Sequence, residues 1–146
     1  MEKISFDSGI KEYRVNGGGV LRFHPGDPNL YVRFLEAAER IQKVEESLTQ
    51  KAKQMEGPDS GAQAVKLMAQ ADKQMKEILK EVFGAQNDFD KILGGINLLA
   101  VADNGERVVT NLFAALQPIL IEGAQRCAKE TSEAALRQAK ARRAAQ

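Results

Sequence analysis

The chain has little of several residue types, and each shortage excludes a class of protein. It has no tryptophan and a single cysteine, Cys127, which excludes an internal disulfide and a cluster of thiolate zinc ligands. No apolar run approaches the roughly 20 residues that a membrane-spanning helix needs, and the first residues lack the apolar core of a signal peptide. These shortages predict a cytoplasmic protein without a membrane partner.

The chain also lacks an excess of charge of either sign. Its 21 Lys and Arg residues against 20 Asp and Glu residues give a formal net charge of +1, so no global field favours nucleic acid or an anionic surface. Its 146 residues suit one domain, and an aromatic content of 5% leaves most of the core to aliphatic side chains, which suits helix packing. Partners must therefore be sought on local surfaces.

Two short alternating segments flank a turn signal near the N-terminus. Residues 11–15 and 20–24 alternate apolar with polar side chains on either side of Asn16 and three glycines, which predicts a β-hairpin. An isolated hairpin is only marginally stable in water, so its apolar face is expected to lie on helices or to pair with a strand of another chain. The side chains on that face are Tyr13, Val15, Leu21 and Phe23.

Two long amphipathic helices are predicted after the hairpin. A helix start at Asp27, a break at residues 57–58 and a second helix from residue 59 or 60 to Phe83 together predict an antiparallel helical hairpin. The apolar stripe of the first helix comprises Tyr31, Phe34, Leu35, Ala38, Ile41, Val44 and Leu48. The stripe of the second comprises Val65, Met68, Ala71, Met75, Ile78, Leu79, Val82 and Phe83.

The C-terminal part is predicted to contain a short helix capped by Asp88 and a last long helix, with a bend expected at Pro118. Beyond Cys127 the sequence is rich in Ala, Gln, Lys and Arg and has little to bury. One domain is expected, comprising an N-terminal arm and hairpin (residues 1–26), a helical body (27–128) and a basic helical or disordered tail (129–146). The fold class is mainly α with a small N-terminal β-hairpin (α+β), built as an antiparallel helical hairpin plus C-terminal helices.

Several motifs have a reactive interpretation, but each has a simpler structural one. The glycines at 17–19 lack the following helix of a phosphate-binding loop, and His24 has no partner at metal-ligand spacing. A catalytic Cys127 would need a histidine, for which His24 is the sole candidate, and residues 87–90 lack the loop and terminal Glu of an EF-hand. We therefore expect no enzyme, catalytic residue, metal or cofactor.

Binding surfaces are the remaining functional feature. The basic C-terminal end has no aromatic residues to stack bases, so nucleic acid is not the favoured partner. The apolar hairpin face and the methionine-bearing second helix can instead accept a helix of another protein, because such side chains adapt to a partner. The candidate partner-binding residues are Tyr13, Val15, Leu21, Phe23, Tyr31, Phe34, Met68 and Met75.

Segments spread over residues 4–126 carry a resemblance to a known family. They are Phe6-Asp7-Ser8-Gly9, Tyr13-Arg14-Val15-Asn16-Gly17, Leu21-Arg22-Phe23, Pro25-Gly26-Asp27, Glu81-Val82-Phe83-Gly84, Asn97-Leu98-Leu99-Ala100 and Asn111-Leu112-Phe113-Ala114-Ala115-Leu116. In these segments the chain resembles small proteins encoded in the tail-gene region of long-tailed phages and prophages of Gram-positive bacteria, which are regarded as tail assembly chaperones.

The resemblance implies a function in the cytoplasm of a bacterial host. A chaperone of this family is expected to bind the tape-measure protein, whose long amphipathic helices would otherwise aggregate, while tail-tube subunits polymerise. Self-association through the edge of the hairpin is a further expectation. The alternatives are a minor structural tail protein that is retained in the virion and a small helical regulator that binds nucleic acid.

Overall fold

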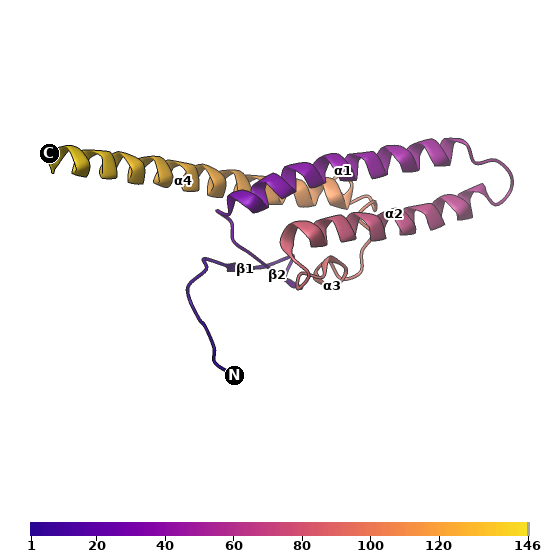
Figure 1. Cartoon of the computed structure of the whole chain (residues 1–146). Helices are drawn as coiled ribbons and strands as arrows, with labels where there is room; N and C mark the ends of the chain where they lie inside the picture. Colours follow the sequence, from indigo (N-terminus) through magenta and orange to yellow (C-terminus); the bar gives the residue numbers. More distant parts are fainter. Residues whose placement is uncertain (146) are drawn as a thin grey trace.

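The computed structural model describes residues 1–145, which form a mainly helical fold with a small two-stranded hairpin (Figure 1). The hairpin consists of β1 (Lys11–Arg14) and β2 (Val20–Phe23). The helices are α1 (Pro28–Lys53), α2 (Ser60–Phe83), α3 (Phe89–Ile92) and α4 (Val108–Ala144). This arrangement confirms the predicted fold class.

The helices α1 and α2 form the predicted antiparallel pair, which is joined by a loop at one end of the molecule (Figure 1). At the start of α1, Asp27 accepts a hydrogen bond from the Asn29 backbone N–H at 2.9 Å, and Pro28 occupies the first turn. At the end of α2, Gly84 adopts a φ of 103° and donates to the Lys80 carbonyl at 2.9 Å. Local capping signals therefore set where α1 begins and where α2 ends.

The helix α4 packs on α1 through its first half and then continues alone beyond the body (Figure 1). An edge-to-face contact between Phe34 and Phe113, with ring centroids 5.0 Å apart, marks the packed half. The helix is continuous through Pro118 and through the basic tail as far as Ala144. The tail is therefore helical and exposed rather than disordered, and Gln146 lies outside the described residues.

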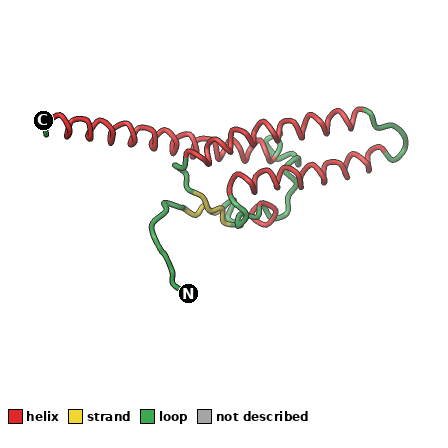
Figure 2. Tube along the Cα trace, in the orientation of Figure 1, coloured by secondary structure: helices red, strands yellow, loops and turns green. Residues whose placement is uncertain are grey.

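The hairpin rests on the helices of its own chain, beside the end of α2 (Figure 2). Antiparallel pairing of Tyr13 with Leu21 puts both side chains on the face turned to the helices. Phe23 stacks on Tyr13 at 4.7 Å and meets the edge of Phe83 at 5.3 Å between ring centroids. Helices of the same chain thus cover this apolar face, with Leu21 and Phe23 buried and Tyr13 and Val15 partly buried.

Two positions of the predicted helical stripes are wrong. Leu35 is 47% exposed and Val65 is 65% exposed, whereas both were expected to face inward. Between Phe34 and Ile41, which lie in the core as predicted, Ala37 is the fully buried residue and Ala38 is only partly buried. Val65 lies near the start of α2, close to the loop that joins the two long helices, where little is buried.

Candidate interaction surfaces

Asn87 attaches the hairpin to the helical body. Its amide oxygen accepts a hydrogen bond from the Arg22 N–H at 2.9 Å, and its amide nitrogen donates to the Arg22 carbonyl at 2.8 Å. The same nitrogen donates to the Phe83 carbonyl at 2.7 Å, and the residue is only 2% exposed. The side chain therefore occupies the outer edge of β2 as a neighbouring strand would, and it ties that edge to the end of α2.

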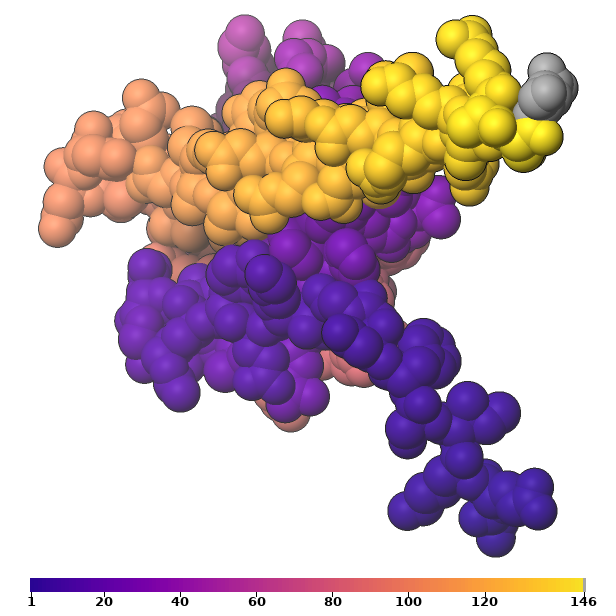
Figure 3. Space-filling view, turned by 90° about the vertical axis from the view of Figure 1, so that its left-hand side faces the viewer, coloured from indigo at the N-terminus to yellow at the C-terminus, as the bar shows by residue number. Residues whose placement is uncertain are grey.

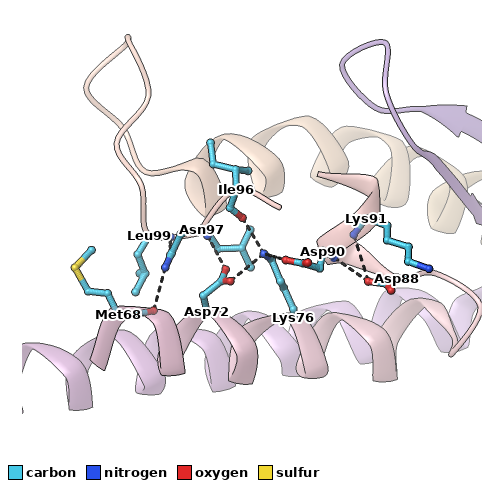
Figure 4. A network of polar contacts seen from close by, with 10 residues as sticks. Met68, Asp72, Lys76, Asp88, Asp90, Lys91, Ile96, Asn97 and Leu99 are labelled. Atoms are coloured by element: carbon cyan, nitrogen blue, oxygen red, sulfur yellow. Dashed lines mark hydrogen bonds and ion pairs between the residues drawn. The ribbon is translucent and has the colours of Figure 1, made fainter. Parts of the chain in front are cut away.

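A second polar cluster centres on Lys76 of α2 (Figure 4). Its ammonium group lies 2.7 Å from Asp90, 2.9 Å from Asp72 and 2.8 Å from the Ile96 carbonyl oxygen. The other oxygen of the Asp72 carboxylate accepts a hydrogen bond from the Leu98 N–H at 2.7 Å. These contacts connect α2 to α3 and to the loop that follows α3.

The same loop is fixed to α2 by Asn97 (Figure 4). Its amide nitrogen donates to the Met68 carbonyl at 3.1 Å, and its amide oxygen accepts from the Leu99 N–H at 2.7 Å. These bonds hold Leu98 and Leu99 in the core, where they are 0% and 1% exposed. The polar cluster thus anchors a loop that would otherwise leave backbone groups without partners.

The electrostatics of this cluster favour charged side chains. Burial would lower the pKa of Lys76, but hydrogen bonds to Asp90 and Asp72 outweigh burial and hold the pKa above its ordinary value. The hydrogen bond and the charge of Lys76 lower the pKa of Asp90. A lysine that stays protonated is not an amine nucleophile, so the cluster is suited to holding the fold.

A groove of about 650 Å³ separates the hairpin side of the molecule from α4. Its lining includes Tyr13 of β1, His24 in the connector before α1, and Ile119, Gly123 and Cys127 of α4. A side chain at Gly123 would collide with the backbone of Pro25, so this glycine permits the close approach of the connector to α4.

The structure brings His24 and Cys127 to the same groove but does not join them. The Nδ1 atom of His24 accepts a hydrogen bond from the Gly26 N–H at 3.0 Å, which matches the expected structural role at the helix start. Within residues 1–145, no hydrogen bond connects His24 with Cys127, and no cluster of His, Cys, Asp and Glu could hold a metal ion. Asp88 caps α3 by accepting from the Asp90 N–H at 3.1 Å, as predicted.

A second groove, of about 560 Å³, runs along the α1–α2 pair. Val44 and Ile78 contribute apolar side chains to it. Charged residues of both signs surround them, namely Arg40, Lys43, Lys73, Glu77 and Glu81. We call this depression the α1–α2 groove.

The candidate partner-binding residues divide into two groups. Leu21, Phe23, Phe34 and Met75 are between 0% and 4% exposed, so they belong to the core and do not offer a surface to a partner. Their apolar character is explained by packing within the chain. The partly buried group, which packs against the core and keeps some accessible surface, comprises Tyr13, Val15, Tyr31 and Met68.

Sequence reasoning missed the residues that organise these surfaces. Asn87 was considered only as a candidate calcium ligand, because its partner Arg22 lies 65 residues away in the chain. Asp72 and Lys76 are spaced four apart on one helix face, and this spacing is the only local signal for the ion pair. Nothing in the sequence pattern indicates that both are about nine-tenths buried.

The N-terminal arm, defined here as residues 1–10, stands away from the body (Figure 3). Ile4 is 91% exposed, Phe6 is 79% exposed and Ile10 is 54% exposed. The sequence predicts an N-terminal arm in this region, and the segment around Phe6 is also one of those that resemble a known family. The exposed apolar side chains of this arm are the clearest mark of a contact surface.

None of the described helices is long and apolar enough to cross a membrane. Comparison with protein-family models, with curated proteins and with solved structures gave no match to this chain.

Proposed function

We propose that the protein is a non-enzymatic tail assembly chaperone or adaptor that binds the tape-measure protein during phage tail morphogenesis in the cytoplasm of the bacterial host. The α1–α2 groove is the observation that carries this proposal, together with the sequence resemblance. At its centre Val44 is partly buried and keeps accessible apolar surface beside Ile78, which is a core residue only 6% exposed, and charges of both signs form the rim. An amphipathic helix fits such a surface, because its apolar stripe covers the centre while its polar flanks meet the charged rim.

The chemistry of the proposed client matches this surface. A tape-measure protein presents long helices with exposed apolar stripes, which associate with one another until they are covered. A shallow and open groove holds such a stripe reversibly, which a chaperone requires in order to hand its client over. The titratable residues nearest the core, Asp72 and Lys76, are engaged in holding the fold.

Co-expression with the tape-measure protein of the same phage or prophage tests the proposal. We expect the chain to increase the soluble fraction of the tape-measure protein and to retain it in a pull-down. The variant Val44→Asp places a charge in the α1–α2 groove and should abolish retention. The matched control is Val32→Asp, because Val32 is an exposed valine of the same helix outside the groove.

Circular dichroism of both variants tests whether they are folded. The surface substitution Lys73→Glu changes the rim of the same groove without touching the core, and it should weaken retention if Val44→Asp impairs folding. Retention by all three variants, or failure of the wild-type chain to retain the tape-measure protein, would exclude the α1–α2 groove as the client site.

The alternative within the same setting is a minor structural tail protein that remains in the virion. Mass spectrometry of purified tails separates the two functions, because a chaperone leaves its client before the particle is complete. We expect the chain to be absent from mature tails. Its presence there in a stoichiometric amount would replace the chaperone by a structural component.

A further inference from the structure

The N-terminal arm has the side-chain pattern of a β-strand, but within residues 1–145 it does not belong to a sheet. Ile4 and Phe6 share one parity in the sequence, so an extended arm presents both side chains on one face, and Ile10 lies beyond the turn at Gly9. At its base, Gly9 adopts a φ of 76° and its N–H donates to Asp7 at 2.9 Å. This turn directs the arm away from its own hairpin (Figure 1), which leaves its apolar face in water.

The hairpin in turn has one edge without a strand. On the outer edge of β2, the N–H and carbonyl of Arg22 bond to Asn87. In an antiparallel pair, two residues that lie directly opposite each other direct their backbone groups either both toward or both away from the partner strand. Arg22 directs its N–H and carbonyl away from β1, so its partner Glu12 directs its own N–H and carbonyl away from β2. The same holds for Arg14, two residues further along β1. Within residues 1–145, no strand pairs with this edge of β1.

The groove described above lies on the face of β1 that carries Lys11 and Tyr13. It is lined by Gly9 and these two residues, by residues 24–28 of the connector that follows β2, and by residues of α4. A strand added along β1 would therefore have one face turned to the groove. Its volume of about 650 Å³ is large enough for bulky apolar side chains such as those of the arm.

We propose that the arm of one copy adds to the open edge of β1 in a second copy and places its apolar face, with Ile4 and Phe6, in the groove beside α4. Each copy then supplies a strand that lacks a sheet and an edge that lacks a strand. This inference concerns the chain alone and does not depend on the tape-measure client.

Charge favours the same pairing. The edge strand carries Lys11 and Arg14, while its only acid, Glu12, is paired with Arg22 at 3.0 Å. Between residues 4 and 10 the arm carries a single charge, that of Asp7. The segment around Ile4 and Phe6 therefore brings no positive charge to this edge, whereas two edges of β1 placed against each other would bring like charges together.

The native thiol of Cys127 in the groove provides a direct test. We would mix the wild-type chain with a chain that carries both Phe6→Cys and Cys127→Ser, so that any bond between positions 6 and 127 joins two copies. We expect a disulfide or a short bismaleimide link between these positions, identified by mass spectrometry of the joined peptides. The matched control carries Val65→Cys and Cys127→Ser, because Val65 is an exposed apolar residue on the body.

Sedimentation of the full chain tests the same contact without cross-linking. We expect a self-associating wild-type chain, a dissociation constant about 100-fold weaker for Phe6→Asp, and no change for Val65→Asp. The arm lies outside the core, so circular dichroism of Phe6→Asp should match that of the wild-type chain. A monomeric wild-type chain, an unchanged Phe6→Asp variant, or linking at position 6 no greater than at position 65 would overturn the proposal.

Discussion

Single buried polar residues decide how the parts of this molecule meet. Asn87 supplies both a donor and an acceptor to the backbone of Arg22, and it also bonds the Phe83 carbonyl. Apolar packing alone is compatible with many positions of a small hairpin, whereas these directional bonds specify one. Lys76 has a comparable role, because it joins α2 to Asp90 of α3 and to the carbonyl of Ile96.

Replacing Asn87 should therefore be costly. We expect Asn87→Ala to lower the free energy of unfolding by about 2–4 kcal/mol, because it leaves buried backbone groups of Arg22 and Phe83 without partners. Urea unfolding followed by circular dichroism measures the change. The control Asn29→Ala, at an exposed position, should stay within about 0.5 kcal/mol of the wild-type chain. Equal effects at both positions would show that Asn87 does not hold the hairpin.

The pair formed by Lys76 and Asp90 predicts a defined dependence of stability on pH. The lowered pKa of Asp90 contributes stability that is present above pH 3.8 and is lost as the pH falls through the pKa of the folded state. The raised pKa of Lys76 contributes stability that is present below pH 10.5 and is lost as the pH rises through its folded-state pKa. The pair therefore stabilises the fold between these limits.

We expect the difference in unfolding free energy between the wild-type chain and Asp90→Asn to be constant near neutral pH. The difference should shrink below pH 3.8 and again above pH 10.5, where one member of the pair loses its charge. Urea titrations at a series of pH values measure it. Asp103→Asn, at an exposed position, provides the control, and a similar pH profile for that variant would contradict the assignment.

At the scale of elements, the close approach of the connector to α4 depends on one glycine. We expect Gly123→Ala to destabilise the fold by about 1–3 kcal/mol, because the added methyl group collides with the backbone of Pro25. Gly61 is a helical glycine with open space around it, so Gly61→Ala should stabilise by about 0.5–1 kcal/mol. Thermal unfolding of the two variants gives the comparison, and a gain in stability for both would contradict the contact.

The distal half of α4 contributes little to the core. Gly123 is the last buried residue of this helix, and residues 135–145 are exposed throughout. Removal of residues 129–146 should therefore reduce the helical signal in circular dichroism while the midpoint of thermal unfolding of the body stays unchanged. A midpoint lowered by many degrees would mean that this half of the helix packs on the body or on another copy.

The elements themselves could be predicted because their signals are local. The alternation around Asn16, the cap at Asp27 and the terminator at Gly84 each act within a few residues, and all three were read correctly. The attachment of the elements could not be predicted in the same way. Asn87 and Asp72 bond to backbone groups 65 and 26 residues away, and no periodic pattern records such a pairing.

At the scale of the whole molecule, the candidate surfaces could likewise be predicted only in part, because they depend on contacts between distant residues. An apolar side chain has the same appearance in the sequence whether it fills the core, as Met75 does, or stands in solvent, as Phe6 does. Burial depends on which elements meet, and that depends on contacts between distant residues. The sequence pattern therefore pointed to apolar hairpin and helix positions, whereas the structure adds the exposure of the apolar side chains of the arm and two grooves.

The proposed function requires that the molecule cover the apolar helices of a tape-measure protein. Light scattering after dilution of the denatured tape-measure protein into buffer tests this claim most directly. We predict that the full chain suppresses scattering at a stoichiometric amount, whereas the Val44→Asp variant does not. Scattering equal to that with an inert protein of the same size would contradict the claim.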